Sequence, residues 1–192
     1  MTHGPPPSDR FRVTQLATRR VYDGRVVRVD LETLRAPDGT TLELEIIHHA
    51  GAAAVVPLLS EQDADDPVVL LLRQYRYAAG GELWEIPAGV LEPGESPLDC
   101  ARRELQEETG AGAESLEYLT TIFTTPGFTD EQIHLFLATG ITVGEPGRGA
   151  DEFMEVEARP MSKVLEMIRD GEIRDGKSIA AILYVAGFRL QM

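Results

Sequence analysis

Cysteine, aromatic residues and long apolar runs are all scarce in this 192-residue sequence. The single cysteine, Cys100, excludes an intramolecular disulfide and a zinc site built from several cysteines. No apolar run approaches the roughly 20 residues that a membrane-spanning helix needs, and the N-terminus lacks the basic start and apolar stretch of a secretory signal. We therefore expect a cytoplasmic protein without a membrane partner.

Positive charge is scarce as well. Lys and Arg number 18 against 32 Asp and Glu, which gives a formal net charge of −14. Proteins that bind nucleic acid normally hold its phosphates with clustered basic residues, so this balance argues against a nucleic-acid partner. An anionic small molecule would need local help from a metal ion or from a few well-placed arginines.

The distribution of turns and apolar segments divides the chain into three parts. Residues 1–13 contain three consecutive prolines and predict a disordered leader. In residues 14–50, β segments are joined at Asp23-Gly24 and Asp38-Gly39, and Asp-Gly between alternating segments is a strong hairpin signal. Residues 51–192 mix short Val-rich strands with helices. The predicted fold class is α/β, a mixed sandwich with an N-terminal antiparallel β appendage.

One helix is marked at both ends. Ser96 supplies an N-cap, Pro97 suits the first helical position, and Gly110 ends the helix. Other elements follow from apolar residues at strand or helix spacing. We expect strands near 52–59, 68–76, 116–124, 132–138 and 153–157, and helices around 164–168 and 179–186.

Three glutamates share one face of the marked helix. Glu104, Glu107 and Glu108 stand at i, i+3 and i+4, so their carboxylates lie within about one turn and repel each other. Carboxylates with no His or Cys nearby suit a hard divalent cation, Mg²⁺ or Mn²⁺, which also binds phosphate. The alternative is a solvated acidic face partly neutralised by Arg103. The preceding loop, which has backbone flexibility and a further acid, Glu95, favours the metal site.

The loop and the helix together carry a longer motif. Residues 89–111, GVLEPGESPLDCARRELQEETGA, resemble the Nudix box: a glycine, five residues, Glu, seven residues, then Arg-Glu-aliphatic-x-Glu-Glu-x-Gly-aliphatic. Only the last position departs, because Ala111 is smaller than the usual Ile, Leu or Val. The resemblance implies a Nudix-type α/β/α sandwich around a mixed sheet. It also implies metal-dependent hydrolysis of a nucleoside diphosphate linked to another group.

The same resemblance assigns a role to the polar groups of the motif. Arg103 would orient the glutamates and, with Glu107, serve catalysis. Mg²⁺ would be the cofactor, with Mn²⁺ as the possible substitute. The implied metal ligands are Glu104 and Glu108, with Glu107 and Glu95 in support and the carbonyl of Ala88 as a further ligand.

Residues outside the box are similar to those of the ADP-ribose pyrophosphatase group. The segments 72–76 and 82–89 resemble the run that precedes the box in that group, and the segment around Pro126 resembles its downstream proline segment. By this resemblance Glu152, on a Gly-rich loop, is the catalytic base or an extra ligand, with Glu155 as second choice. The substrate would be held by Arg76, Arg73, Gly89, Pro126 and Gly127. An ordinary turn, solvated arginines and a solvated acidic loop are the alternatives.

The sequence thus predicts hydrolysis of ADP-ribose to AMP and ribose 5-phosphate. The resemblance further implies a homodimer in which residues 14–50 reach the partner subunit and its substrate, while residues 51–192 form the Nudix hydrolase domain. Two alternatives stay open. The substrate is another nucleoside diphosphate sugar or dinucleotide, such as GDP-mannose, ADP-glucose or FAD, or the protein is a non-catalytic nucleotide sensor with the same fold.

Overall fold

The computed structural model describes residues 12–62, 64–144 and 154–192. These residues form two compact units. The first unit combines the chain up to Ala50 with the segment Thr125–Glu131, and the second holds Gly51–Thr124 and Gln132–Met192. Most of the expected leader and the loop glutamate Glu152 lie outside the described residues.

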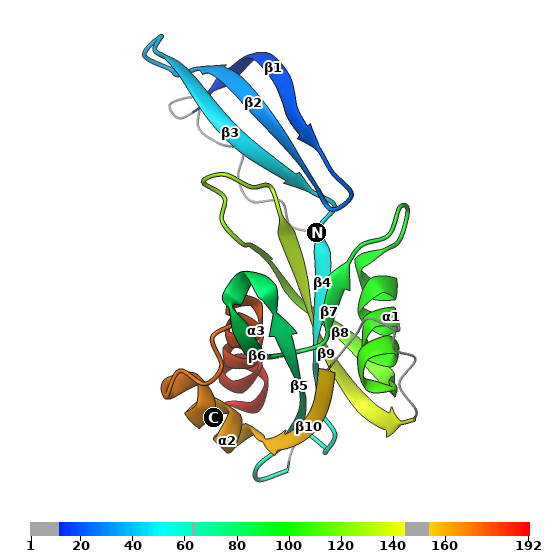
Figure 1. Cartoon of the computed structure of the whole chain (residues 1–192). Helices are drawn as coiled ribbons and strands as arrows, with labels where there is room; N and C mark the ends of the chain where they lie inside the picture. Colours follow the sequence, from blue (N-terminus) through cyan, green and yellow to red (C-terminus); the bar gives the residue numbers. More distant parts are fainter. Residues whose placement is uncertain (1–11, 63, 145–153) are drawn as a thin grey trace. The chain divides into compact units, whose positions relative to one another are not determined.

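The first unit is an antiparallel sheet of three strands, β1 (Thr14–Asp23), β2 (Val27–Arg35) and β3 (Thr41–His49), in the order β1-β2-β3 (Figure 1). The two hairpins predicted from the Asp-Gly pairs are present, and Gly39 has a φ of +87°, which glycine adopts without strain. The segment Thr125–Glu131 joins this unit through β3. Ile47 N donates to Phe128 O at 2.8 Å, and Asp130 N donates to Ile47 O at 3.2 Å.

The second unit contains two sheets. A mixed four-stranded sheet has the order β7-β4-β9-β8, in which only β4 and β9 are parallel, and an antiparallel sheet has the order β10-β5-β6. The strands are β4 (Ala52–Pro57), β5 (Val68–Arg76), β6 (Gly81–Glu85), β7 (Ala88–Val90), β8 (Ala111–Phe123), β9 (Gln132–Val143) and β10 (Met154–Pro160). The helices are α1 (Pro97–Thr109), α2 (Met161–Arg169) and α3 (Gly176–Val185), with a 3₁₀ turn, η2 (Tyr77–Ala79), and a π-helical turn, η3 (Ala186–Leu190).

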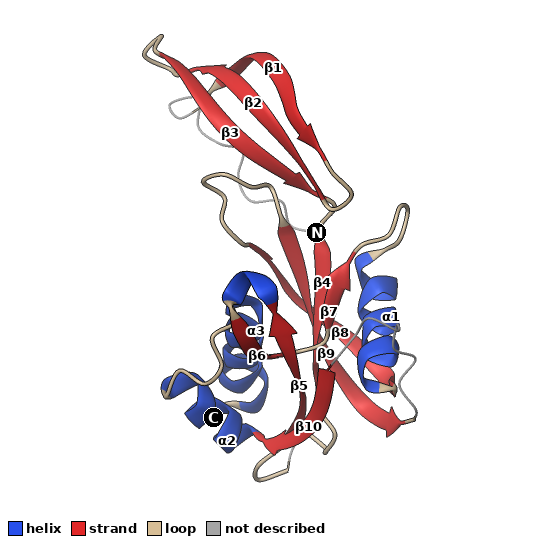
Figure 2. Ribbon diagram, viewed as in Figure 1, coloured by secondary structure: helices blue, strands red, loops and turns tan. Residues whose placement is uncertain are grey.

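Helices cover the sheets of the second unit from both sides (Figure 2). One core cluster joins Ala53, Val55 and Phe136 of the mixed sheet to Ala101 and Leu105 of α1. The other cluster joins the opposite residues of the same strands to α2 and α3, as alternation along a strand requires. The α/β/α sandwich around a mixed sheet is therefore confirmed. None of the described helices is long and apolar enough to cross a membrane.

The structure also corrects some details of the expected elements. The strands β6 and β7 were not predicted, because they are short and interrupted by Ile86-Pro87, where proline cannot donate a backbone hydrogen bond. β8 begins directly after the helix at Ala111 and runs much longer than its apolar pattern indicated. In the first turn of α1 the apolar side chain of Leu98 is 39% exposed, whereas Cys100 is buried.

Candidate active site

The helix α1 is held at its two ends and along one face. Ser96 Oγ accepts a hydrogen bond from Asp99 N at 3.1 Å, and Gly110, with a φ of +72°, donates from its backbone N to Gln106 O at 2.9 Å. The side chains of Ala101 and Leu105 are buried against the mixed sheet. The predicted helix is thus confirmed at both ends, and its docking fixes where its glutamates stand.

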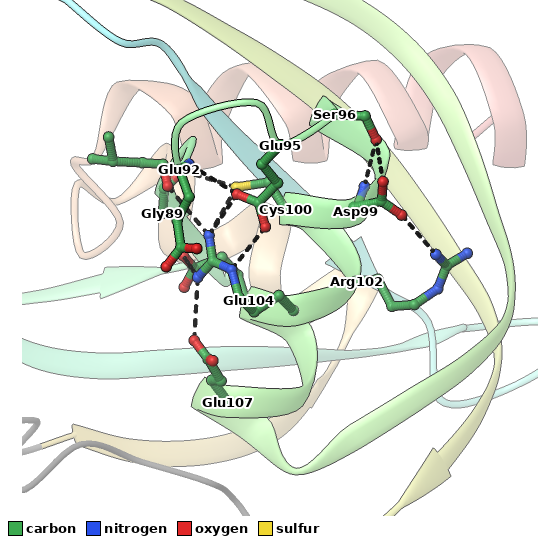
Figure 3. Close-up of polar contacts among 11 residues, drawn as sticks. Gly89, Glu92, Glu95, Ser96, Asp99, Cys100, Arg102, Glu104 and Glu107 are labelled. Atoms are coloured by element: carbon green, nitrogen blue, oxygen red, sulfur yellow. Dashed lines mark hydrogen bonds and ion pairs between the residues drawn. The ribbon is translucent and has the colours of Figure 1, made fainter.

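Arg103 contacts three carboxylates, those of Glu95, Glu104 and Glu107, and Figure 3 labels these three glutamates. Its Nε and Nη2 donate to the two oxygens of Glu95 at 2.8 and 2.9 Å. Its Nη1 donates to Glu104 Oε1 at 2.6 Å and to Glu107 Oε2 at 3.2 Å, and Nη2 also donates to Val90 O at 3.2 Å. One guanidinium therefore connects the loop before the helix to two of the three helical glutamates, as the resemblance implied for this arginine.

The loop acid Glu95 is the strongest partner of this arginine. The hydrogen bond from Arg103 lowers the pKa of Glu95 to about 2, although partial burial opposes its ionised form. Glu95 also accepts from Glu92 N at 3.0 Å, which folds the loop onto itself. The same contacts raise the pKa of Arg103, with the Glu95 hydrogen bond as the main cause. Both groups stay charged at neutral pH.

Glu104 and Glu108 are the buried members of the set, at 9% and 5% exposure. Ala88 N donates to Glu108 Oε2 at 2.9 Å, which ties the strand β7 to the helix. Next to it, Gly89 leaves room for Glu104, since a Cβ at this position would lie 1.7 Å from Glu104 Oε1. A side chain at position 89 would therefore collide with the carboxylate of Glu104 in its present position.

The chemistry of this donor set fits a hard divalent cation. Four glutamates and Arg103 leave a formal excess of three negative charges in one place, two of the carboxylates being largely buried. Such crowding is costly unless a cation offsets it. All the side-chain donors are oxygens, as Mg²⁺ and Mn²⁺ prefer. Glu104 and Glu108, with the neighbouring Glu107, Glu95 and Ala88 carbonyl, are the groups that could hold the ion.

A second acidic group occurs in the first unit. Ligand-type atoms of Asp30, Glu32 and His48 lie within 4.8 Å of one another among the described residues. Here, however, Arg20 donates to Asp30 through two nitrogens and supplies the positive charge itself. The ring of His48 is also engaged by Asp130, with Nδ1 2.6 Å from Asp130 Oδ2. We therefore interpret the second group as an ion-pair network of the sheet.

Sequence reasoning missed a buried ionic network on β6 and α3. Glu85, only 2% exposed, accepts hydrogen bonds from Arg76 Nε at 2.7 Å, Arg76 Nη2 at 2.8 Å and Lys177 Nζ at 2.6 Å. Burial opposes the ionised form of Glu85, but these hydrogen bonds and the charge of Lys177 hold its pKa below the usual value. The pKa of Arg76 is raised, first by the hydrogen bond to Glu85 and further by the charges of Glu85 and Glu108. Among the glutamates of the box, Glu108 is the one whose charge contributes to this shift.

Arg73 takes up different contacts from Arg76. It pairs with Glu82, Nη2 to Oε2 at 2.5 Å, and its guanidinium lies 5.7 Å from the ring centre of Trp84. Trp84, the single tryptophan of the chain, packs against the core. Glu155, the second choice for the loop acid, is exposed on β10 with its carboxylate 3.9 Å from Arg73. The first choice, Glu152, lies outside the described residues.

Pro126 and Gly127 belong to the first unit of the fold. They lie in the segment Thr125–Glu131, whose hydrogen bonds run to β3. The structure therefore groups these two predicted substrate contacts with the N-terminal sheet, whereas Arg76, Arg73, Gly89 and the glutamates of the box belong to the second unit.

Comparisons with known proteins agree with this site. The NUDIX domain family matches residues 48–182, and the chain belongs to that family. It is 36% identical over 172 residues to "ADP-ribose pyrophosphatase" of Bacillus subtilis, which covers 88% of this chain and 90% of that protein. It is also 36% identical over 177 residues to "Methanol dehydrogenase activator" of Bacillus methanolicus, covering 91% and 93%.

A solved structure, "Crystal structure of ADP compounds hydrolase", has the same fold. It superposes with a TM-score of 0.80 over 95% of this chain and 96% of that chain, at 21% sequence identity. The protein is thus a Nudix hydrolase in fold and in the residues of its box.

Proposed function

We propose that this protein hydrolyses the pyrophosphate bond of ADP-ribose to AMP and ribose 5-phosphate, with Mg²⁺ or Mn²⁺ as cofactor. The supporting observation is the complete acid set of the box, in which Gly89 and Ala88 N fit around the buried carboxylates of Glu104 and Glu108. The name of the Bacillus subtilis relative supports the choice of substrate.

Each residue of the box contributes to this reaction in its own way. Glu104 and Glu108 hold the divalent cation, with Glu107, Glu95 and the Ala88 carbonyl close by. Arg103 keeps Glu104 and Glu107 oriented through its two Nη1 hydrogen bonds. When bound, the metal lowers the pKa of the attacking water and neutralises charge on the diphosphate.

The remaining predicted residues complete the proposal. Glu152 accepts the proton of the attacking water or orients it. Arg76 holds a phosphate oxygen, which its 45% exposed side chain leaves it free to do while it pairs with Glu85. Arg73, the Gly89 backbone, Pro126 and Gly127 are the further substrate contacts that the resemblance implies.

The direct test is release of phosphate in the presence of alkaline phosphatase. The panel contains ADP-ribose, ADP-glucose, GDP-mannose, FAD, diadenosine polyphosphates and nucleoside triphosphates, each with Mg²⁺ and with Mn²⁺. Turnover that is fastest on ADP-ribose and absent in EDTA supports the proposal. Fastest turnover of GDP-mannose or FAD would mean that the proposed substrate is wrong but the proposed pyrophosphate hydrolysis is right. Binding of ADP-ribose without any turnover would indicate a sensor.

We also propose a homodimer that uses the N-terminal sheet. β1 is exposed along its whole length, and large apolar side chains of the sheet are among the exposed ones: Leu16, Val21, Tyr22, Leu42 and Leu44. Exposed apolar side chains that gather on one small sheet are typical of a protein–protein interface. Light scattering after size exclusion should give about twice the 21.1 kDa of one chain, and a monomeric mass would refute this part.

A further inference from the structure

Glu85 has more positive charge around it than its own burial needs. A buried carboxylate must be paired and hydrogen-bonded, and one arginine in two-point contact satisfies that need. Here Arg76 makes that two-point contact and Lys177 donates to the same oxygen, Oε2, at 2.6 Å. These three groups carry a formal charge of one positive unit together, and the carboxylate of Asp175, 2.9 Å from Lys177 Nζ, offsets it.

The pair with Glu85 leaves the guanidinium of Arg76 accessible. The side chain of Arg76 is 45% exposed, while that of Glu85 is 2% exposed. The two hydrogen bonds use Nε and one hydrogen of Nη2, out of the five N–H donors that a guanidinium carries. Arg76 is therefore fixed along one edge and can still bind a ligand oxygen.

Lys177 is fixed from the other side by the start of α3. Its Nζ donates to Asp175 Oδ2 at 2.9 Å, and its side chain is 13% exposed. Asp175 caps the helix by accepting from Ser178 N, and Ser178 Oγ accepts from Ile86 N at 2.9 Å, next to Glu85 in the chain. The ammonium group is thus held against Glu85 by both the helix and the strand.

We propose that Glu85 and Lys177 are positioning residues that hold Arg76 against the substrate diphosphate. Glu85 fixes the direction of the guanidinium. Lys177 neutralises Glu85, so that the positive charge of Arg76 remains effective toward the phosphates. This inference rests on the proposed function, because it needs a diphosphate in the site next to Glu108.

A purely structural role for the network makes a different prediction. In that case loss of Glu85 would lower stability and all activity parameters together, and its effect would add to that of losing Arg76. A positioning role acts only through Arg76, so the two effects on substrate affinity are not additive. A contact made equally in the ground and transition states changes KM and leaves kcat nearly constant.

The experiment is a double-mutant cycle on the full chain with Arg76→Met, Glu85→Gln and the double variant. KM and kcat are measured for ADP-ribose, and the Kd for ADP is measured by calorimetry with Mg²⁺. The matched control is Glu117→Gln, which breaks an exposed pair on β8, where Arg189 Nε donates to Glu117 Oε1 at 2.9 Å. Melting temperatures report folding for every variant.

The expected result is a rise of about tenfold in KM and in the Kd for ADP in Arg76→Met, the effect of losing one charge-assisted hydrogen bond. Glu85→Gln should reproduce most of that rise with kcat within about threefold, and the double variant should match Arg76→Met. An unchanged KM and Kd in Glu85→Gln would overturn the proposal. So would a rise in the double variant equal to the product of the two single-variant rises, because the two residues would then act independently. The control should keep the wild-type values.

Lys177→Met keeps the proposal testable if Glu85→Gln does not fold. It leaves the Arg76–Glu85 pair intact and should raise the Kd for ADP about threefold. When Arg76→Met is already present, adding Lys177→Met should not raise the Kd further. An unchanged Kd would refute the role of Lys177. Failure of the proposed function itself is seen separately, as absence of ADP-ribose turnover in the wild-type protein while ADP binding still follows the cycle.

Discussion

Replacing Gly89 by alanine should remove activity while leaving the fold nearly intact. The new Cβ would lie 1.7 Å from Glu104 Oε1 and 2.1 Å from its Cδ, whereas ordinary contacts begin at 3.4 Å. The carboxylate must therefore retreat by about 1.7 Å, the difference between 3.4 and 1.7 Å. A misplacement of about 1 Å can cost on the order of 10²-fold in rate, so kcat should fall at least about 100-fold.

The cost in stability is smaller, because the displaced atoms are the far end of a flexible side chain. The variant loses the Glu104 hydrogen bond to Arg103, which contributes about 1.5–3 kcal/mol, and gains up to about 1 kcal/mol because alanine restricts the unfolded chain. The melting temperature should drop by a few degrees at most. Phosphate release measures kcat, and Gly187→Ala, where a Cβ meets nothing within 4 Å, is the control.

A cycle with Glu104→Gln separates this explanation from a general distortion of the strand. If Gly89→Ala acts through Glu104, the double variant should be no slower than the slower single variant. A kcat of Gly89→Ala within about threefold of wild type would refute the reasoning. So would full additivity of the two changes, which would mean that the alanine disturbs something other than this carboxylate.

Three further predictions follow from the same structure. Glu108→Gln should reduce kcat by at least about 100-fold, with a melting temperature close to wild type, as phosphate release and calorimetry would measure. The pKa of Glu85 is lowered because Arg76 and Lys177 outweigh burial, so its contribution to stability is complete above the ordinary value of 4.5 and is lost as pH falls below it. Urea midpoints should show a smaller loss on acidification in Glu85→Gln than in wild type. Burial raises the pKa of Cys100 to about 12, so a thiol reagent at about pH 8 should label it only after denaturation.

The elements predicted best are those whose signals lie inside the segment itself. The limits of α1 follow from Ser96, Pro97 and Gly110, each acting through a backbone group within one turn. The hairpins of the first unit likewise depend on local Asp-Gly pairs. The box could be assigned because residues 89–111 match the Nudix pattern in register, and that match needs no knowledge of distant contacts.

Features that depend on distant residues could not be predicted. Glu85 and Lys177 are 92 residues apart, and nothing near either residue shows that they meet. In a sequence, a glutamate that ends a strand and a lysine in the first turn of a helix both look like ordinary surface residues. Only the structure shows that the glutamate is buried and that these two side chains are paired. The grouping of Thr125–Glu131 with the N-terminal sheet has the same origin, since it depends on hydrogen bonds to Ile47.

The two ionic networks of the second unit explain how so acidic a chain can bind an anionic substrate. In the box the four proposed ligand carboxylates exceed the one cation Arg103, and in the proposed function a divalent metal would offset this excess. Around Glu85, Arg76 and Lys177 both donate to one buried carboxylate, while the side chain of Arg76 stays 45% exposed. A diphosphate between them would meet metal charge on one side and guanidinium charge on the other. The net charge of the whole chain is therefore a poor guide to the charge of its ligand. Binding of an anion depends on the positions of a few cationic groups in the site.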